Sequence, residues 1–166
     1  MDATTVKAVG WLGETWGFWI QTGALFASVV AAIWLIVHNG KQARMRSLID
    51  LIIQQKSNKD LYEAIQLVYR LAENGKPLSS LVEEDTEERR KILVVLNNQE
   101  FIATGIRMGA FDGKLYKQMQ CSNVVKLWNA ASGFVCELRK IDGKNTIFQD
   151  FEQLAQSWEK VPIKKI

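Results

Sequence analysis

Hydrophobic and polar positions divide the chain into two unlike parts. Residues 16–37 carry no charged side chain, and the only strongly polar ones among them are Gln21, Thr22 and Ser28. A helix of that length measures about 33 Å, and the hydrocarbon core of a bilayer is roughly 30 Å thick. The stretch also lacks the polar face that a buried helix of a soluble protein would normally show. We therefore expect one transmembrane helix over residues 16–37.

The charges around this run set its expected orientation. A secretory signal would have cations before the apolar run and a cleavage site after it. Here Lys7 alone precedes the run, whereas Lys41, Arg44 and Arg46 follow it closely. Cations next to a span stay on the cytoplasmic side. We expect a single-pass membrane protein, with residues 1–15 outside, a cytoplasmic domain over 41–160 and a basic tail over 161–166.

Small residues recur along the predicted span at helical spacing. They form two neighbouring i, i+4 ridges, the first made of Gly23, Ala27 and Ala31 and the second of Ala24, Ser28 and Ala32. Such ridges allow helix backbones to approach closely in a membrane. They are candidates for contact with a second copy of the chain or with another membrane protein, although small residues are also common in spans that pair with nothing.

Beyond residue 40 the apolar positions recur with a helical period, and no convincing alternation of period two appears. The sequence predicts an all-α protein, with a compact bundle of about five helices after the span. Residues that favour helix ends predict a break at Asn39–Gly40 and a new helix after Ser57–Asn58 that ends at Asn74–Gly75. It then predicts a third helix over about 87–108, a fourth capped by Asp112, and a last one capped by Asn145 or Thr146.

The third predicted helix is apolar on nearly every side except one narrow stripe. Its members are Asn97, Glu100, Thr104 and Arg107, spaced 3, 4 and 3 residues apart. The stripe is either a solvated strip or a buried network. In a network Glu100 would need a cation, either Arg107 or an arginine of another helix, because an unpaired buried carboxylate is very costly. Such a network could hold the fold together or form a binding site.

Composition narrows the function classes. Residues 38–166 carry 20 cations and 16 acids, and no basic stripe interleaves with aromatic residues, so nucleic acid is not an expected partner. Cys121 and Cys136 fall on one predicted helix too far apart for a disulfide. With His38 as the only histidine, a zinc site is not expected. No phosphate loop, nucleophile elbow or credible triad appears, so we expect neither an enzyme nor a cofactor.

The stretch from Glu87 to Tyr116, followed by "LWNAASGFVCELR" and "FEQLAQSWEK", resembles an uncharacterised bacterial and prophage family. Its pattern L-N-x-x-E-x-x-A-x-G-I-R-x-G falls on Leu96, Asn97, Glu100, Ala103, Gly105, Ile106, Arg107 and Gly109. The resemblance implies one N-terminal span followed by a helical domain, and it implies no activity. Occurrence in prophages suggests a phage-exclusion or defence setting.

These features favour a membrane-anchored interaction or regulatory module at the inner face of a bacterial membrane. Its expected partners are the lipid bilayer and either a second copy or another membrane protein. The alternative is a small oligomeric membrane effector that perturbs permeability, although the span offers few polar groups with which to line a pore.

Overall fold

The computed structural model describes residues 16–75 and 77–161 as helices and short connections. The elements in chain order are α1 (Trp16–Ser57), α2 (Lys59–Glu73), the 3-10 helix η2 (Leu78–Leu81), α3 (Glu87–Arg107), α4 (Gly113–Asp142) and α5 (Gln149–Lys160). No strand occurs in this described part, which confirms the all-α prediction. The predicted N-terminal segment 1–15, and the tail beyond residue 161, lie outside the described residues.

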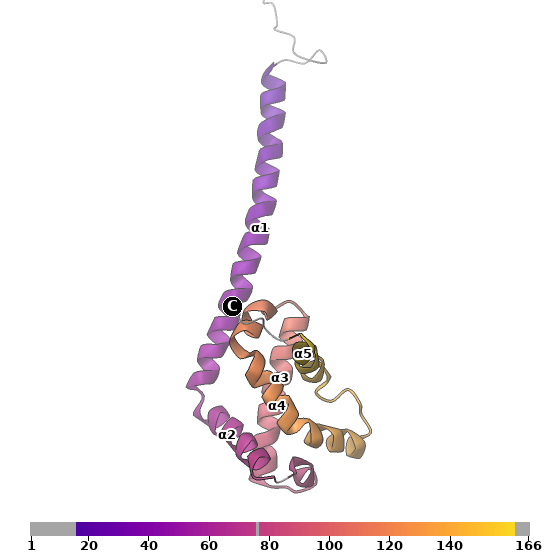
Figure 1. The fold of residues 1–166 in the computed structure, drawn as a ribbon. Helices are drawn as coiled ribbons and strands as arrows, with labels where there is room; N and C mark the ends of the chain where they lie inside the picture. The colour runs from indigo at the N-terminus through magenta and orange to yellow at the C-terminus, as the bar shows by residue number, and fades with distance from the viewer. Residues whose placement is uncertain (1–15, 76, 162–166) are drawn as a thin grey trace, which may run out of the picture. The chain divides into compact units, whose positions relative to one another are not determined.

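Helix α1 is continuous through the position where the sequence predicted a break, as Figure 1 shows. The prediction of a helix end at Asn39–Gly40 is therefore wrong. A glycine inside a helix costs only about 1 kcal/mol relative to alanine, and only proline would remove a backbone donor. The residues that follow Gly40 are good helix formers, so the intrahelical hydrogen bonds continue to Ser57.

The chain separates into two units, residues 1–42 and 43–166, so α1 contributes to both. In the first unit the described part of α1 contains an apolar segment long enough to cross a bilayer, and none of that segment is buried. The second unit comprises residues 43–57 of α1 together with all the later helices. The predicted bundle of about five helices is thus built from α2 to α5 and the end of α1.

Local capping explains where most helices of the second unit begin. The side chain of Asn58 accepts a hydrogen bond from the Leu61 N–H at the start of α2, and Thr86 does the same for the Arg89 N–H at the start of α3. Asp112 accepts hydrogen bonds from two N–H groups of α4. Each cap satisfies donors that the first helical turn leaves without partners. Helix α4 ends at Gly143, which has the left-handed conformation typical of a helix terminus.

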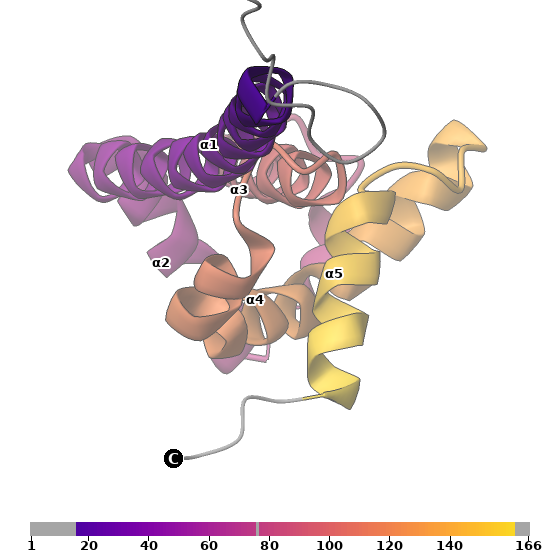
Figure 2. The ribbon, with the colours of Figure 1, turned by 90° about the horizontal axis from the view of Figure 1, so that it is seen from above.

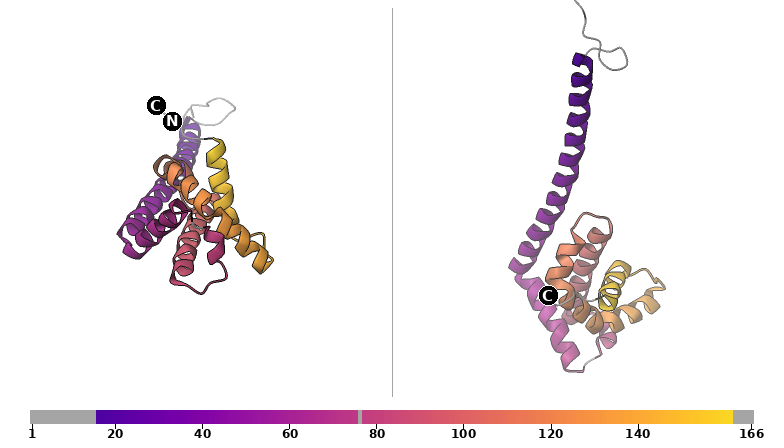
Figure 3. Two further views of the ribbon diagram at one scale, coloured as in Figure 1. Left: turned by 60° about the horizontal axis from the view of Figure 1, so that its bottom comes forward. Right: turned by 45° about the horizontal axis from the view of Figure 1, so that its top comes forward.

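The core of the second unit lies where the amphipathic faces of these helices meet. Helix α3 packs against α2 and α5, and α4 packs against η2, α5 and α2; Figures 2 and 3 show this arrangement from other directions. The largest fully buried side chains come from every element of the unit: Leu48, Val68, Leu81, Ile92, Val95, Leu96, Ile102, Val124, Phe134, Val135 and Phe151.

The turn between α3 and α4 depends on two glycines. Gly109 has a φ of +72°, a left-handed conformation that side chains disfavour. Gly105 lies under the ring of Phe111, and a Cβ placed on it would come within 2.4 Å of two ring carbons. A side chain at position 105 would therefore force the Phe111 ring to move away from the end of α3.

We predict that Gly105→Ala lowers the stability of the bundle by about 1–3 kcal/mol, the usual cost of overpacking, because the Phe111 ring must move. The matched control is Gly133→Ala in α4, where a Cβ would meet nothing within 4 Å. That control should raise stability by about 0.4–1 kcal/mol. Unfolding of the full chain in detergent, followed by circular dichroism, measures both, and equal behaviour of the two variants would contradict the role given to Gly105.

Candidate functional site

The start of α5 depends on a side chain from another helix. Phe148 occupies its N-cap position with a φ of 54° and provides no side-chain hydrogen bond, so the predicted caps Asn145 and Thr146 are wrong. Instead, the Glu100 carboxylate of α3 accepts hydrogen bonds from the backbone N–H of Asp150 at 3.2 Å and of Phe151 at 2.8 Å. Glu100 thus caps α5 from α3, where the positive end of the helix dipole also favours its charge.

Asp150 of α5 in turn binds side chains of α3. Its carboxylate accepts hydrogen bonds from the Thr104 hydroxyl at 2.7 Å and from Arg107 Nε at 2.9 Å, and its side chain is only 10% exposed. The Thr104 hydroxyl, followed by the Arg107 guanidinium, holds the pKa of Asp150 below its ordinary value although burial opposes this. The prediction that a buried Glu100 pairs with a cation is wrong for the described residues. Arg107 pairs with Asp150, and the Glu100 carboxylate accepts hydrogen bonds from backbone N–H groups.

Three of the four predicted stripe residues therefore hold α5 against α3. The fourth, Asn97, is exposed and makes no polar contact with the described residues. The rest of the motif is structural as well: Leu96 and Ala103 are buried in the core, and the two glycines shape the α3–α4 turn. Of the four candidate residues, Glu100, Thr104 and Arg107 thus form a set of contacts with the start of α5, which we call the clasp, and Asn97 does not take part in it.

The predicted ridges of the apolar segment lie on the exposed surface of α1. A Cβ placed on Gly23 would meet nothing within 4 Å, and the small residues that follow on both ridges are all exposed. The Ser28 hydroxyl donates to the Ala24 carbonyl one turn earlier at 2.8 Å. Its oxygen lone pairs remain available as acceptors for a neighbouring helix, and the ridges stay a predicted contact surface.

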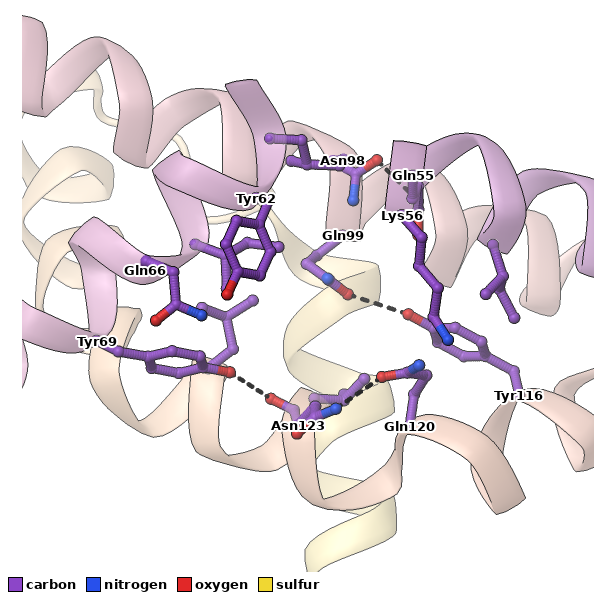
Figure 4. Close-up of a pocket in the computed structure, with 15 residues that line it drawn as sticks. Gln55, Lys56, Tyr62, Gln66, Tyr69, Asn98, Gln99, Tyr116, Gln120 and Asn123 are labelled. Carbon is purple, nitrogen blue, oxygen red and sulfur yellow. Dashed lines mark hydrogen bonds between the residues drawn. The ribbon is translucent and has the colours of Figure 1, made fainter. Parts of the chain in front are cut away.

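A cavity of about 330 Å³ lies where α1, α2, α3 and α4 of the second unit converge (Figure 4). It was not anticipated from the sequence. Its polar lining consists of six carboxamides, all three tyrosines of the chain and one lysine: Gln55, Gln66, Asn98, Gln99, Gln120, Asn123, Tyr62, Tyr69, Tyr116 and Lys56. Five aliphatic side chains complete the walls: Ile52, Leu61, Ile65, Val124 and Leu127.

The hydrogen bonds across this cavity are incomplete. Gln55 Nε2 donates to Asn98 Oδ1 at 2.9 Å, but the buried Asn98 Nδ2 has no partner among the described residues. The Tyr116 hydroxyl donates to Gln99 Oε1 at 3.5 Å, at the limit of a hydrogen bond. Burial raises the pKa of Tyr116 far above its ordinary value, so its hydroxyl stays protonated and remains a donor at any physiological pH.

The periodicity of apolar residues along the sequence could not reveal this cavity. Each lining amide looks like an ordinary surface residue on its own helix, and only the packing of four helices brings them together. The one available signal was the spacing of Tyr62, Gln66 and Tyr69, which lie at i, i+4 and i+7 on one face of α2. In the described part of the chain no group of three or more metal-binding side chains is present.

Comparison with known protein families identifies the family to which the chain belongs. Residues 22–158, most of its length, match the family model described as a domain of unknown function, DUF4760. The chain belongs to the DUF4760 family. No curated protein and no solved structure matches it. The family match confirms membership of an uncharacterised domain family, and its range includes both the apolar segment from Thr22 and the helical bundle. The bacterial or prophage origin and the sequence motif stay predictions.

We predict that the clasp between α3 and α5 weakens at acidic pH. A carboxylate whose pKa is lower in the folded than in the unfolded state stabilises the fold fully above its unfolded value, and this contribution is lost as the pH falls through the folded pKa. The ordinary value for Asp150 is 3.8. The difference in unfolding midpoint between the DUF4760 chain and Asp150→Asn should therefore be constant near neutral pH and should shrink below about pH 4.

Thermal unfolding in detergent at pH 2.5 to 7 measures this difference. Thr104→Val is the control, because it removes the hydroxyl donor and should move the loss of stability to higher pH. A difference between the native chain and Asp150→Asn that persists unchanged to pH 2.5 would show that Asp150 does not act through its charge.

Proposed function

We propose that this DUF4760 protein is a membrane-anchored interaction or regulatory module, without catalytic activity, that acts at the inner face of a bacterial membrane. The observation that carries the proposal is the uncovered apolar segment of α1. Phe26 is 67% exposed and Ile36 is 71% exposed, and all the residues between them are exposed as well. Leaving one such side chain in water rather than burying it costs about 1.5–3 kcal/mol, so a bilayer is the environment that suits this segment.

The proposed orientation rests on the cations beyond the segment. Lys41, Arg44 and Arg46 are exposed on α1 directly after the apolar residues, and the positive-inside rule assigns such positions to the cytoplasm. The helical domain would then be confined to the membrane surface, where its effective concentration towards other membrane proteins is high. A phage-exclusion or defence setting is part of this proposal through the family resemblance.

The arrangement of acidic groups supports a non-catalytic role. The best placed carboxylates, Glu100 and Asp150, already accept hydrogen bonds from the backbone of α5 and from α3 side chains. Glu152 of α5 forms an ion pair with Arg139 of α4 at 2.8 Å. These groups hold helices together, which leaves them little freedom to exchange protons with a substrate.

We predict that the chain remains in membranes after alkaline carbonate extraction and that its domain faces the cytoplasm. Cys136 is exposed and Cys121 is buried, so a membrane-impermeant maleimide reports on one native position. It should label Cys136 in inverted vesicles and not in intact cells, and Cys136→Ser is the control that removes the signal. Labelling in intact cells would reverse the proposed orientation, and loss of the chain to the soluble fraction would reject the anchor.

We predict that the ridges mediate self-association within the membrane. Gly23→Leu combined with Ala27→Leu fills the closest approach of two helices and should abolish in-membrane crosslinking between copies. Val29→Leu is the control, since it enlarges a neighbouring position outside both ridges. If the double variant crosslinks as well as the native chain, the ridges are passive and the anchor serves only for attachment.

A further inference from the structure

We propose that the four-helix cavity of the second unit binds a nucleobase, carried on a nucleoside or a nucleoside monophosphate. This inference goes beyond the proposed anchoring function and does not depend on it, because every lining residue belongs to the bundle. The cavity volume of about 330 Å³ lies at the lower end of the range for small-molecule sites. A metabolite therefore fits it better than a folded partner or a long peptide.

The charges of the lining restrict the ligand class. In the described structure the lining contains no carboxylate, so no negative charge there would compensate the charge of an amine or a divalent cation. Lys56 is its only charged side chain, and it is exposed at the edge of the cavity. One cation can receive one anionic group, but a triphosphate would need several cations or backbone donors. The ligand is thus neutral or carries a single phosphate.

The carboxamides determine the shape of what is recognised. A carboxamide carries a donor and an acceptor in a single plane, and asparagine and glutamine can use this pair to bind the edge of a nucleobase with two hydrogen bonds. In the described structure Asn98 Oδ1 already accepts from Gln55 Nε2, and Gln120 Oε1 accepts from Asn123 Nδ2 at 2.8 Å, so the ligand would pair first with the N–H groups of Asn98 and Gln120. Figure 4 shows Asn98 and Gln99 at one side of the cavity and Gln120 and Asn123 at the opposite side. A flat heterocycle with donors and acceptors on two edges can pair with both sides together.

One buried hydrogen-bond donor of the cavity wall has no acceptor among the described residues. Asn98 Nδ2 is buried and lacks an acceptor among the described residues, and Figure 4 shows it directed towards the cavity. A buried donor without a partner costs about 1–3 kcal/mol, so native structures seldom keep one without a reason. Gln99 is the only buried polar residue of the described core, at 8% exposed, and its contact with Tyr116 is long. A small rotation of the Asn98 amide would bring Nδ2 into the cavity, where a ring nitrogen or carbonyl of the ligand would supply the missing acceptor.

Aromatic rings on α2 supply a surface for stacking. Tyr62 is 59% exposed at the cavity, and its ring has no hydrogen-bonded or aromatic partner among the described residues. Tyr69 lies two turns further on, with Lys126 Nζ 4.6 Å from its ring centre, so one of its faces is already occupied. Stacking of a base on an aromatic side chain contributes about 1–3 kcal/mol. Tyr62 is therefore the stacking residue, and Tyr69 forms part of the wall.

The test is equilibrium binding to the full chain in lipid nanodiscs, measured by calorimetry with the four common ribonucleosides and their 5′-monophosphates. We expect saturable binding of at least one base. Asn98→Leu should weaken it by about tenfold or more, the loss of one well-formed hydrogen-bonded pair. Asn97→Leu is the matched control, because Asn97 is the preceding residue of α3 and points away from the cavity. Unchanged binding in Asn97→Leu is expected.

A second pair keeps the test decisive if Asn98→Leu unfolds. Gln120→Leu should weaken binding, whereas Gln118→Leu, on the exposed surface of the same helix, should not. The native chain should bind a nucleoside monophosphate more tightly than the nucleoside because Lys56 pairs with the phosphate, and this difference in affinity should disappear in Lys56→Gln. Absence of saturable binding at millimolar concentration, or equal binding by cavity variants and their controls, would overturn the proposal.

Discussion

The capping of α5 by Glu100 is the interaction on which the closed bundle depends. Helix α5 has only twelve residues and no cap of its own, and an isolated helix of that length is marginal in water. Two backbone N–H groups reach the Glu100 carboxylate, and Asp150 returns a contact to Thr104 and Arg107. Hydrogen bonds to a charged group contribute about 1.5–3 kcal/mol each. They fix the position in which α5 inserts its aromatic side chains into the core.

The core then depends on that position. Phe151 is fully buried, and its ring makes an edge-to-face contact with the ring of Trp128 of α4, with centroids 5.3 Å apart. Trp158 lies two turns along α5 against Tyr116, whose hydroxyl reaches the amide-lined cavity. The clasp at the start of α5 and the cavity between the other helices are thus connected through one packed layer. Loss of the clasp would disturb Tyr116 as well as the helix it holds.

Most of the secondary structure could be predicted from the sequence because its determinants are local. The starts of α2, α3 and α4 follow from the capping residues Asn58, Thr86 and Asp112, and the end of α4 follows from the glycine after it. Two local predictions were wrong for opposite reasons. Gly40 is a weak helix breaker that good neighbours outweigh, and the start of α5 is set by Glu100, some fifty residues away.

The sequence by itself therefore determined the helical class and the apolar segment, since both arise from periodicity and from interactions within one or two turns. It also predicted that Glu100, Thr104 and Arg107 share one helix face, because their spacing is helical, but it left open whether they face solvent or another helix. Only the tertiary structure decided what they act on, and only it assembled the amide-lined cavity. Both require contacts between helices that are distant in the chain, and such contacts depend on how complete side-chain surfaces fit together rather than on any local pattern.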